Sequence, residues 1–198
     1  MRRVRRKAHQ LAGRINARRP GVHQHRHDTL PDRYPEAFGA LAEMAQDPAA
    51  VLSFGCSNGT ELVSLKRYWP DAAIVGVEIN PALRLVARAR ARTQVVAEIP
   101  DRRFDVVLAM AVLCRHPMTA HPTEWYPFSD FRDQVRRLVD AVEPGGLACF
   151  DNVSYRPTDA DDRIEPVWSG GDAARIVPVH DPDGTSAEPV GPIFRRVR

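Results

Sequence analysis

A turn bounded by two glycines, early in the chain, has the composition of a binding site for an oxygen-rich ligand. Residues 51–61 read VLSFGCSNGTE, so an apolar run passes through Gly55 and Gly59 into a stretch that suits a helix. Glycine permits a positive φ and lets backbone amides approach a ligand, while the N–H groups at a helix start attract acceptor oxygens. This succession of strand, turn and helix start suits a nucleotide-like cofactor.

A carboxylate follows at the spacing that a nucleotide requires. The apolar run at 74–77 ends at Glu78, which lies 19 positions after Gly59. An acidic residue at about 20 positions accepts the ribose hydroxyls in nucleotide-binding βαβ units. The sequence GCSNGT at 55–60 fits neither the G-x-G-x-x-G of nicotinamide dehydrogenases nor a P-loop, which ends in Lys and Ser or Thr. A doubly wound domain that has lost its cofactor is the structural alternative.

Several segments in this order resemble the motifs of class I S-adenosylmethionine (SAM)-dependent methyltransferases, over residues 48–156. Residues 52–61 resemble the first motif, although Ser53 stands where an acid is usual and Ser57 where a glycine is usual. Residues 104–113 resemble the fourth strand, and the EPGGLACF segment at 143–150 resembles the turn into the fifth. The resemblance implies a three-layer α/β sandwich around a mainly parallel, seven-stranded Rossmann-like sheet. The implied strand order is 3-2-1-4-5-7-6 with an antiparallel C-terminal strand, and residues 174–179 and 192–197 resemble the strands that finish this fold.

The resemblance also assigns residues to the cofactor, SAM or its product S-adenosylhomocysteine. Glu98, after the third strand, resembles the carboxylate on the adenine side. The segment before the first strand often covers the cofactor pocket in this fold, so Arg33 and Tyr34 are candidate contacts; a Tyr that anchors a helix and an Arg in a surface ion pair are the alternatives. The full set of expected cofactor contacts is Ser53, Gly55, Cys56, Ser57, Asn58, Gly59, Glu78, Ile79, Asn80, Glu98, Ile99, Met110 and Ala111.

Polar and aromatic residues concentrate after the fourth strand, where a substrate would bind. Ligands of open α/β sheets lie beyond the carboxyl ends of the strands. Methyl transfer is an in-line displacement that depends on alignment, and a base is needed only when the acceptor is protonated at neutral pH. His116 is the preferred base because imidazole titrates near that pH, His121 is the second choice, and Arg115 would hold a carboxylate or phosphate. The expected substrate contacts are Tyr34, Trp125, Tyr126, Asn152 and Tyr155. Aromatic side chains that pin a surface loop are the alternative.

A fainter resemblance connects the chain to chemotaxis-receptor methyltransferases. It covers the first motif and the Leu-Cys-Arg sequence at 113–115. Residues 1–47 are too few for the separate N-terminal domain of that family, so its glutamyl substrate is not expected here.

Charge divides the chain into a basic arm and an acidic body. Residues 1–33 contain ten Arg or Lys and two Asp, for a net charge of +8, which leaves −5 for the remainder. The arm, around residues 2–19, could bind the phosphates of a nucleic acid, or pack on the acidic body or on the second subunit of a homodimer. Aromatic residues do not alternate with these arginines, so base stacking is unsupported. We therefore expect a basic arm and capping helix at 1–47 and a SAM-binding methyltransferase domain at 48–198.

Composition favours one compact core in the cytoplasm. The 198 residues are 43% hydrophobic, and no apolar run is long enough for a membrane span or a secretory signal. The three cysteines lack metal-ligand spacing, so reduced thiols are expected. His23, His25 and His27 alternate without a completing Cys or acidic cluster, and residues 181–184 lack the rest of a calcium loop. No metal site is predicted.

These observations together predict a SAM-dependent methyltransferase that acts on a small polar metabolite. An RNA or protein methyltransferase that docks through the basic arm is the first alternative. A SAM-binding module without turnover is the second, and it belongs to a different functional class.

Overall fold

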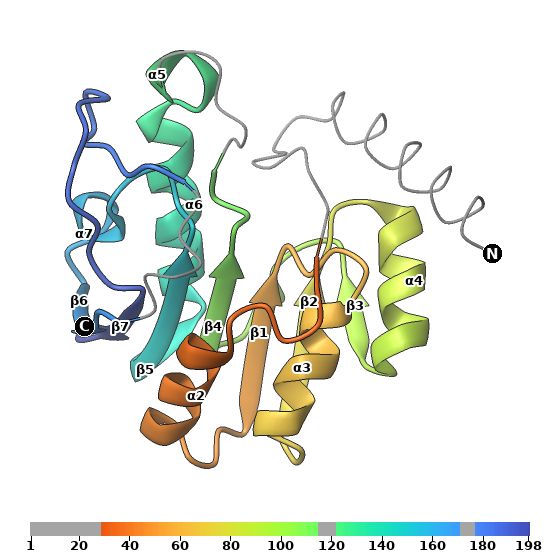
Figure 1. Cartoon of the computed structure of the whole chain (residues 1–198). Helices are drawn as coiled ribbons and strands as arrows, with labels where there is room; N and C mark the ends of the chain where they lie inside the picture. Colours follow the sequence, from red (N-terminus) through yellow and green to blue (C-terminus); the bar gives the residue numbers. More distant parts are fainter. Residues whose placement is uncertain (1–28, 115–121, 171–176) are drawn as a thin grey trace.

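The computed structural model describes residues 29–114, 122–170 and 177–198, without the side chains of Pro122 and Trp125. Within these residues the chain forms a seven-stranded sheet of order β3-β2-β1-β4-β5-β7-β6 (Figure 1). Its strands are β1 (Ala50–Phe54), β2 (Ala73–Val77), β3 (Gln94–Val96), β4 (Phe104–Met110), β5 (Val142–Asp151), β6 (Ile164–Trp168) and β7 (Ile193–Arg196). The five strands from β3 to β5 pair in parallel, and β7 pairs antiparallel with both β5 and β6. The predicted strand order and the antiparallel final strand are confirmed.

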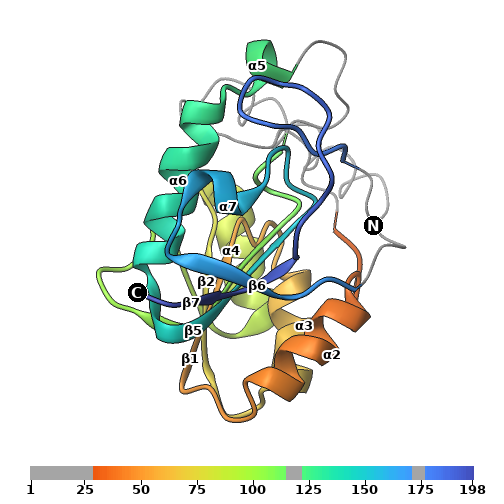
Figure 2. The same cartoon turned by 90° about the vertical axis from the view of Figure 1, so that its left-hand side faces the viewer.

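Helices cover both faces of the sheet and complete the three predicted layers. The helices are α2 (Pro35–Met44), α3 (Thr60–Tyr68), α4 (Pro81–Ala91), α5 (Pro122–Trp125), α6 (Phe128–Asp140) and α7 (Pro157–Ala160). Figures 1 and 2 show α2, α3 and α4 on one face and α6 on the other. Side chains alternate along a strand, so Val51 of β1 packs in the core beneath α2 and α3 while Leu52 packs in the core beneath α6. Both side chains are fully buried.

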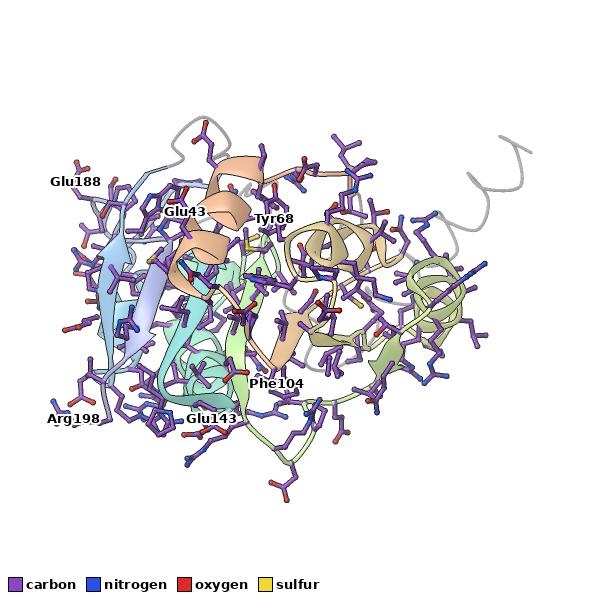
Figure 3. The ribbon with its side chains drawn as sticks, turned by 90° about the horizontal axis from the view of Figure 1, so that it is seen from below. Glu43, Tyr68, Phe104, Glu143, Glu188 and Arg198 are labelled. Carbon is purple, nitrogen blue, oxygen red and sulfur yellow. The ribbon has the colours of Figure 1, made fainter. Side chains whose placement is uncertain are left out.

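Because the strands from β3 to β5 are parallel, their carboxyl ends lie along one edge of the sheet and their amino ends along the opposite edge. The carboxyl ends of β1, β2, β4 and β5 lie together at the upper edge in Figure 1, where the fold places its ligands. Figure 3 shows the opposite edge, at which Phe104 and Glu143 mark the starts of β4 and β5. The Pro-Gly-Gly residues of the segment at 143–150 lie inside β5. The pairing of β5 with β4 is irregular there, because it shifts from Phe104–Val142 to Val106–Leu147.

The strand that pairs with β7 lies earlier in the chain than predicted. A strand was expected at 174–179, of which residues 174–176 lie outside the described residues and residues 177–179 form no strand. The partner of β7 is β6, Ile164–Trp168. The run that forms β6 was not singled out in the sequence, and it contains Pro166, which cannot donate to a sheet ladder. The structure accommodates it because β6 is the edge strand and its pairing with β7 shifts between Pro166 and Trp168.

The segment before β1 belongs to the same core as the sheet. Phe38 and Leu41 of α2 are buried in the cluster that also contains Val51. The chain just before α2 is tied to α3 by the backbone N–H of Asp32, which donates to Ser64 Oγ at 3.0 Å. The proposed boundary at residue 47 stays a prediction. None of the described helices is long and apolar enough to cross a membrane.

Candidate cofactor-binding site

The turn after β1 is held in shape by backbone contacts with β2 and by close packing of two helices. The N–H groups of Gly55 and Cys56 donate to the carbonyl of Val77 at 2.8 and 3.0 Å. Gly59, with φ at 81°, forms the N-cap of α3, and a Cβ added there would lie 2.7 Å from the Cα of Ala87 in α4. Only glycine fits that conformation and that space. The turn therefore has one defined backbone shape.

Glu78 presents a carboxylate fixed by the backbone at the end of β2. Its Oε2 accepts from the N–H of Ser57 at 2.9 Å, and its Oε1 accepts from the N–H of Asn80 at 2.7 Å. Burial raises the pKa of this carboxyl, while the two N–H donors act to lower it. A carboxylate has about four lone-pair positions, so two backbone donors leave acceptor capacity for the hydroxyls of a ribose. The structure thus orients Glu78 before any ligand arrives.

Three of the five described non-glycine residues with a positive φ lie at the same edge. Ser57, Ala111 and Asn152 have φ values of 50°, 52° and 52°, although none is glycine. They follow β1, β4 and β5, and the N–H of Ala111 donates to the carbonyl of Asp151 at 2.8 Å. Left-handed conformations of such residues cost roughly 1–3 kcal/mol each and tend to occur at functional sites. The strain supports a binding function for this edge.

The structure adds an acidic residue that the set of expected cofactor contacts did not include. The Oγ of Ser53, at the carboxyl end of β1, donates to Oε1 of Glu61 in the first turn of α3 at 2.7 Å. Burial raises the pKa of Glu61 to about 7, against the opposing effects of the Ser53 hydrogen bond and the charge of Arg33. An acid in the first turn after a motif that lacks its usual acid was the available sequence signal. Ser53 therefore contacts a carboxyl instead of supplying one.

Tyr34 lies in this region, as the prediction of a covering segment implied. Its side chain is 5% exposed, and its hydroxyl has no hydrogen-bond partner among the described residues. Burial raises the pKa of Tyr34, the charge of Arg33 opposes this, and Asp151, Glu61 and Cys114 raise it further. The guanidinium carbon of Arg33 lies 5.2 Å from the centre of the Tyr34 ring. Contacts of these two residues with cofactor or substrate stay predictions.

Several other expected cofactor contacts have structural partners. The side-chain oxygen of Asn80 caps α4 by accepting from the N–H of Ala82 and Leu83, at 2.9 and 3.3 Å. That of Asn58 accepts from Thr60 and from Arg90, which joins the start of α3 to α4. The other expected contacts lie at the ends of their strands, with Cys56 and Met110 buried, Ile79 and Ile99 partly buried, and Glu98 exposed. Direct contact of any of these residues with the cofactor stays a prediction.

Two of the predicted substrate contacts are deep in an aromatic cluster. Tyr126 and Tyr155 are 1% and 0% exposed, and the hydroxyl of Tyr155 donates to the carbonyl of Tyr126 at 2.6 Å. Both rings pack against Phe131 of α6. The structure gives these tyrosines a packing role, and their contact with a substrate stays a prediction. Asn152 lies at the strained end of β5 and is 3% exposed.

The predicted catalytic residues Arg115, His116 and His121 lie outside the described residues, as do His23, His25, His27 and the side chain of Trp125. Their roles stay predictions. In the part of the chain that is described, no three His, Cys, Asp or Glu side chains gather in a way that could hold a metal ion.

Comparisons with known proteins agree with the motif assignment. A family model for a methyltransferase domain matches residues 22–184. A trans-aconitate 2-methyltransferase from Rhodopseudomonas palustris (strain BisB18) is 31% identical over 59% of this chain and 43% of its own length. A carboxy-S-adenosyl-L-methionine synthase from Chromohalobacter salexigens is 30% identical over 68% of this chain and 51% of its own.

Among solved structures, the sugar N-methyltransferase KedS8 from a Streptoalloteichus species superimposes with a TM-score of 0.48 and 23% identity, over 70% of this chain and 55% of that one. The chain spans about half or less of the length of the curated relatives named above. Because the family model covers most of the sequence, including every strand from β1 to β6, the chain belongs to the methyltransferase-domain family.

Proposed function

We propose that this protein is a SAM-dependent methyltransferase that acts on a small polar metabolite. The observation that carries the proposal is the carboxylate of Glu78, which two backbone N–H groups hold beside the glycine turn at the end of β2. Membership of the methyltransferase-domain family supports the reaction class. The relative named for trans-aconitate, a small polycarboxylate, supports the class of acceptor.

The described residues fit the parts of SAM. Glu78 would accept the ribose hydroxyls, and the backbone of Gly55 to Gly59 would lie against the remainder of the cofactor. The hydroxyl of Tyr34 is buried and has no hydrogen-bond partner in the described part of the chain, so a ligand atom is a natural partner for it. SAM, when bound, would supply a methyl group activated by its sulfonium. The protein would contribute alignment and exclusion of water, which suffice for much of the rate of an in-line transfer.

The acceptor side of the proposal depends on residues outside the described part. Arg115 would pair with a carboxylate of the metabolite, and His116, or failing that His121, would take a proton from an acceptor that is protonated at neutral pH. A cytoplasmic location and a homodimer belong to the same set of proposals.

Calorimetric titration of S-adenosylhomocysteine tests the proposal. Wild type is expected to bind in the micromolar range and Glu78→Ala at least about tenfold more weakly, because a hydrogen bond to a charged group contributes about 1.5–3 kcal/mol. Glu143→Ala is the matched control, since Glu143 is exposed at the opposite edge of the sheet (Figure 3). NADH is the control ligand and should not bind. A folded wild type that fails to bind S-adenosylhomocysteine would overturn the proposal.

The basic arm motivates one competing function. Its net charge of +8 would suit an RNA or protein methyltransferase that docks through residues 2–19. Association with RNA that weakens steeply with added salt would favour this alternative. A SAM-binding module without turnover would instead bind S-adenosylhomocysteine normally and transfer no methyl group to any acceptor in a screen with labelled SAM.

A further inference from the structure

We propose that the outer face of α4 binds a lipid surface of net negative charge. The exposed side chains of Leu85 and Val86 would enter the apolar boundary beneath the lipid headgroups, and the arginines around them would lie among the headgroups. The helix lies at the β3 end of the molecule (Figure 1). None of the expected cofactor contacts belongs to α4, so the inference does not depend on the proposed function.

The solvent side of α4 carries an apolar stripe. Leu85 is 65% exposed and Val86 is 45% exposed, and they are two of the four large hydrophobic side chains that are exposed among the described residues. Ala82 and Ala89 are exposed as well, so these four residues follow the i, i+3, i+4, i+7 spacing of one helix face. The buried face is also apolar and consists of Leu83, Ala87 and Ala91. A helix that is apolar on both sides is normally covered on both, and the described residues cover only one.

The other side chains of α4 and its C-cap are cationic. The helix consists of Pro, Ala, Leu, Val and Arg alone, without an acid or a neutral polar residue. Arg84 acts on Glu78, because its positive charge lowers the pKa of that carboxyl. The remaining arginines are exposed, and none of the ion pairs among the described residues includes them: Arg88, Arg90 and Arg92. The outer face therefore combines positive charge with exposed aliphatic side chains.

This positive charge decides between the possible occupants of the face. Residues 1–33 have a net charge of +8, so the basic arm would be repelled from α4. Two copies of the chain that met through this helix would bring their arginines together, which is unfavourable for the same reason. A nucleic acid offers charged phosphates and bases that stack on aromatic side chains, but α4 contains no aromatic residue. The occupant must be anionic and must also accept Leu85 and Val86.

The placement of the guanidinium groups favours a lipid surface over an acidic protein. The Nε of Arg88 donates to the carbonyl of Val95 at 2.8 Å, and Arg90 donates to Thr60 Oγ1 at 2.7 Å. These bonds hold both groups against the body, so they supply charge without extending a free fork toward individual carboxylates. Anionic headgroups need no such pairing, because they attract nearby arginines by net charge while buried aliphatic area adds to the affinity. The basic arm would be attracted to the same surface.

Cosedimentation of the full chain with lipid vesicles tests the proposal. Vesicles of phosphatidylglycerol mixed equally with phosphatidylcholine are compared with vesicles of phosphatidylcholine alone. The first test variant is the double substitution Leu85→Ser, Val86→Ser. Its matched control is Leu30→Ser, Val197→Ser, which replaces the other two exposed large hydrophobic side chains among the described residues.

A second pair of variants tests the charge. Arg88→Gln, Arg92→Gln removes two positive charges from α4, and the control Arg136→Gln, Arg137→Gln removes two from exposed positions on α6. The basic arm is intact in all four variants, so its attraction to the vesicles is common to them. Thermal unfolding verifies that each variant is folded.

Wild type is expected to partition onto the mixed vesicles at least about tenfold more strongly than onto phosphatidylcholine alone, because several arginines contribute. Leu85→Ser, Val86→Ser should lower the partition onto mixed vesicles about tenfold, through loss of buried aliphatic area. Arg88→Gln, Arg92→Gln should lower it about tenfold as well, and each control by less than about twofold.

Three results would overturn the proposal. The first is a wild type that does not bind the mixed vesicles, and the second is binding of the two α4 variants that equals that of their controls, which would assign the binding to the basic arm. The third is binding of wild type to poly-L-glutamate but not to vesicles, with loss of that binding in the α4 variants. This last result would identify an acidic polypeptide as the occupant of the face.

Discussion

Two acids beside one glycine turn differ in what holds them. Both oxygens of Glu78 accept from backbone N–H groups, which belong to Ser57 and Asn80. Glu61 has a single side-chain donor, Ser53, and the neighbouring charge of Arg33. Glu78 is thus held by the backbone of the turn and of the α4 cap, whereas Glu61 is surrounded by side chains from two other segments. A carboxyl whose one hydrogen-bond donor among the described residues is neutral gains most from a positively charged group.

The largest expected effect comes from a substitution that disturbs the surroundings of both Glu78 and Glu61. Gly59→Ala places a Cβ 2.7 Å from the backbone of Ala87 at a φ of 81°, in the turn that carries Ser57 and begins the helix of Glu61. We expect a loss of unfolding free energy of about 3 kcal/mol, from left-handed strain and overpacking. Urea unfolding measures it. Gly39→Ala, in open space within α2, is the control and should change stability by less than about 1 kcal/mol. Equal effects of the two substitutions would contradict the tight packing of α3 on α4.

The second prediction concerns Glu61, whose substitution is expected to raise the unfolding free energy of the ligand-free protein. Because burial raises the pKa of Glu61 from 4.5 to about 7, the folded state takes up the proton more readily than the unfolded state. The cost of ionising Glu61 in the fold is absent below about pH 4.5 and fully present above about pH 7. Glu61→Gln should therefore stabilise the ligand-free protein by about 2 kcal/mol at pH 8 and have little effect at pH 4.

Urea unfolding of wild type and Glu61→Gln at the two pH values measures this difference, with Glu143→Gln as the exposed control. If Glu61→Gln instead lowers the unfolding free energy at pH 8, the Ser53–Glu61 hydrogen bond stabilises the fold by more than burial of the charge costs. If Glu61→Gln raises the unfolding free energy and also weakens S-adenosylhomocysteine binding, Glu61 contributes to ligand binding at a cost to stability.

The smallest expected effect concerns the support of Glu78. Asn80→Ala removes the side-chain acceptor that caps α4 but keeps the backbone N–H that binds Glu78. We expect a loss of about 1 kcal/mol in unfolding free energy, as for other N-caps. Affinity for S-adenosylhomocysteine should fall a few-fold, because the N–H of residue 80 is then less firmly placed. An unchanged unfolding free energy would show that Pro81 and the packing of α4 define the start of the helix without the cap.

Sequence reasoning succeeded where residues close in the chain are also close in space. Gly55, Gly59 and Glu78 belong to one strand-turn-helix-strand unit, so their spacing predicted a shared site, and the motif order predicted the sheet. It missed β6, a short run that contains Pro166, and the proline is tolerated there because β6 is the edge strand of the sheet. It also could not tell that Tyr126 and Tyr155 are buried against Phe131, because a rim residue and a core residue carry the same aromatic ring.

The sequence by itself determined the glycine turn and the acid that follows it, because backbone periodicity and turn chemistry are local properties. The strand order was implied by the resemblance of the motifs to class I methyltransferases. Tertiary structure alone decided that Ser53 would meet Glu61, that the charge of Arg33 would act on Glu61, and that the hydroxyl of Tyr34 would be buried without a hydrogen-bond partner among the described residues. Burial and the pKa shift that it causes depend on segments far apart in the chain packing together. The charge environment of Glu61 is therefore a property of the packed fold.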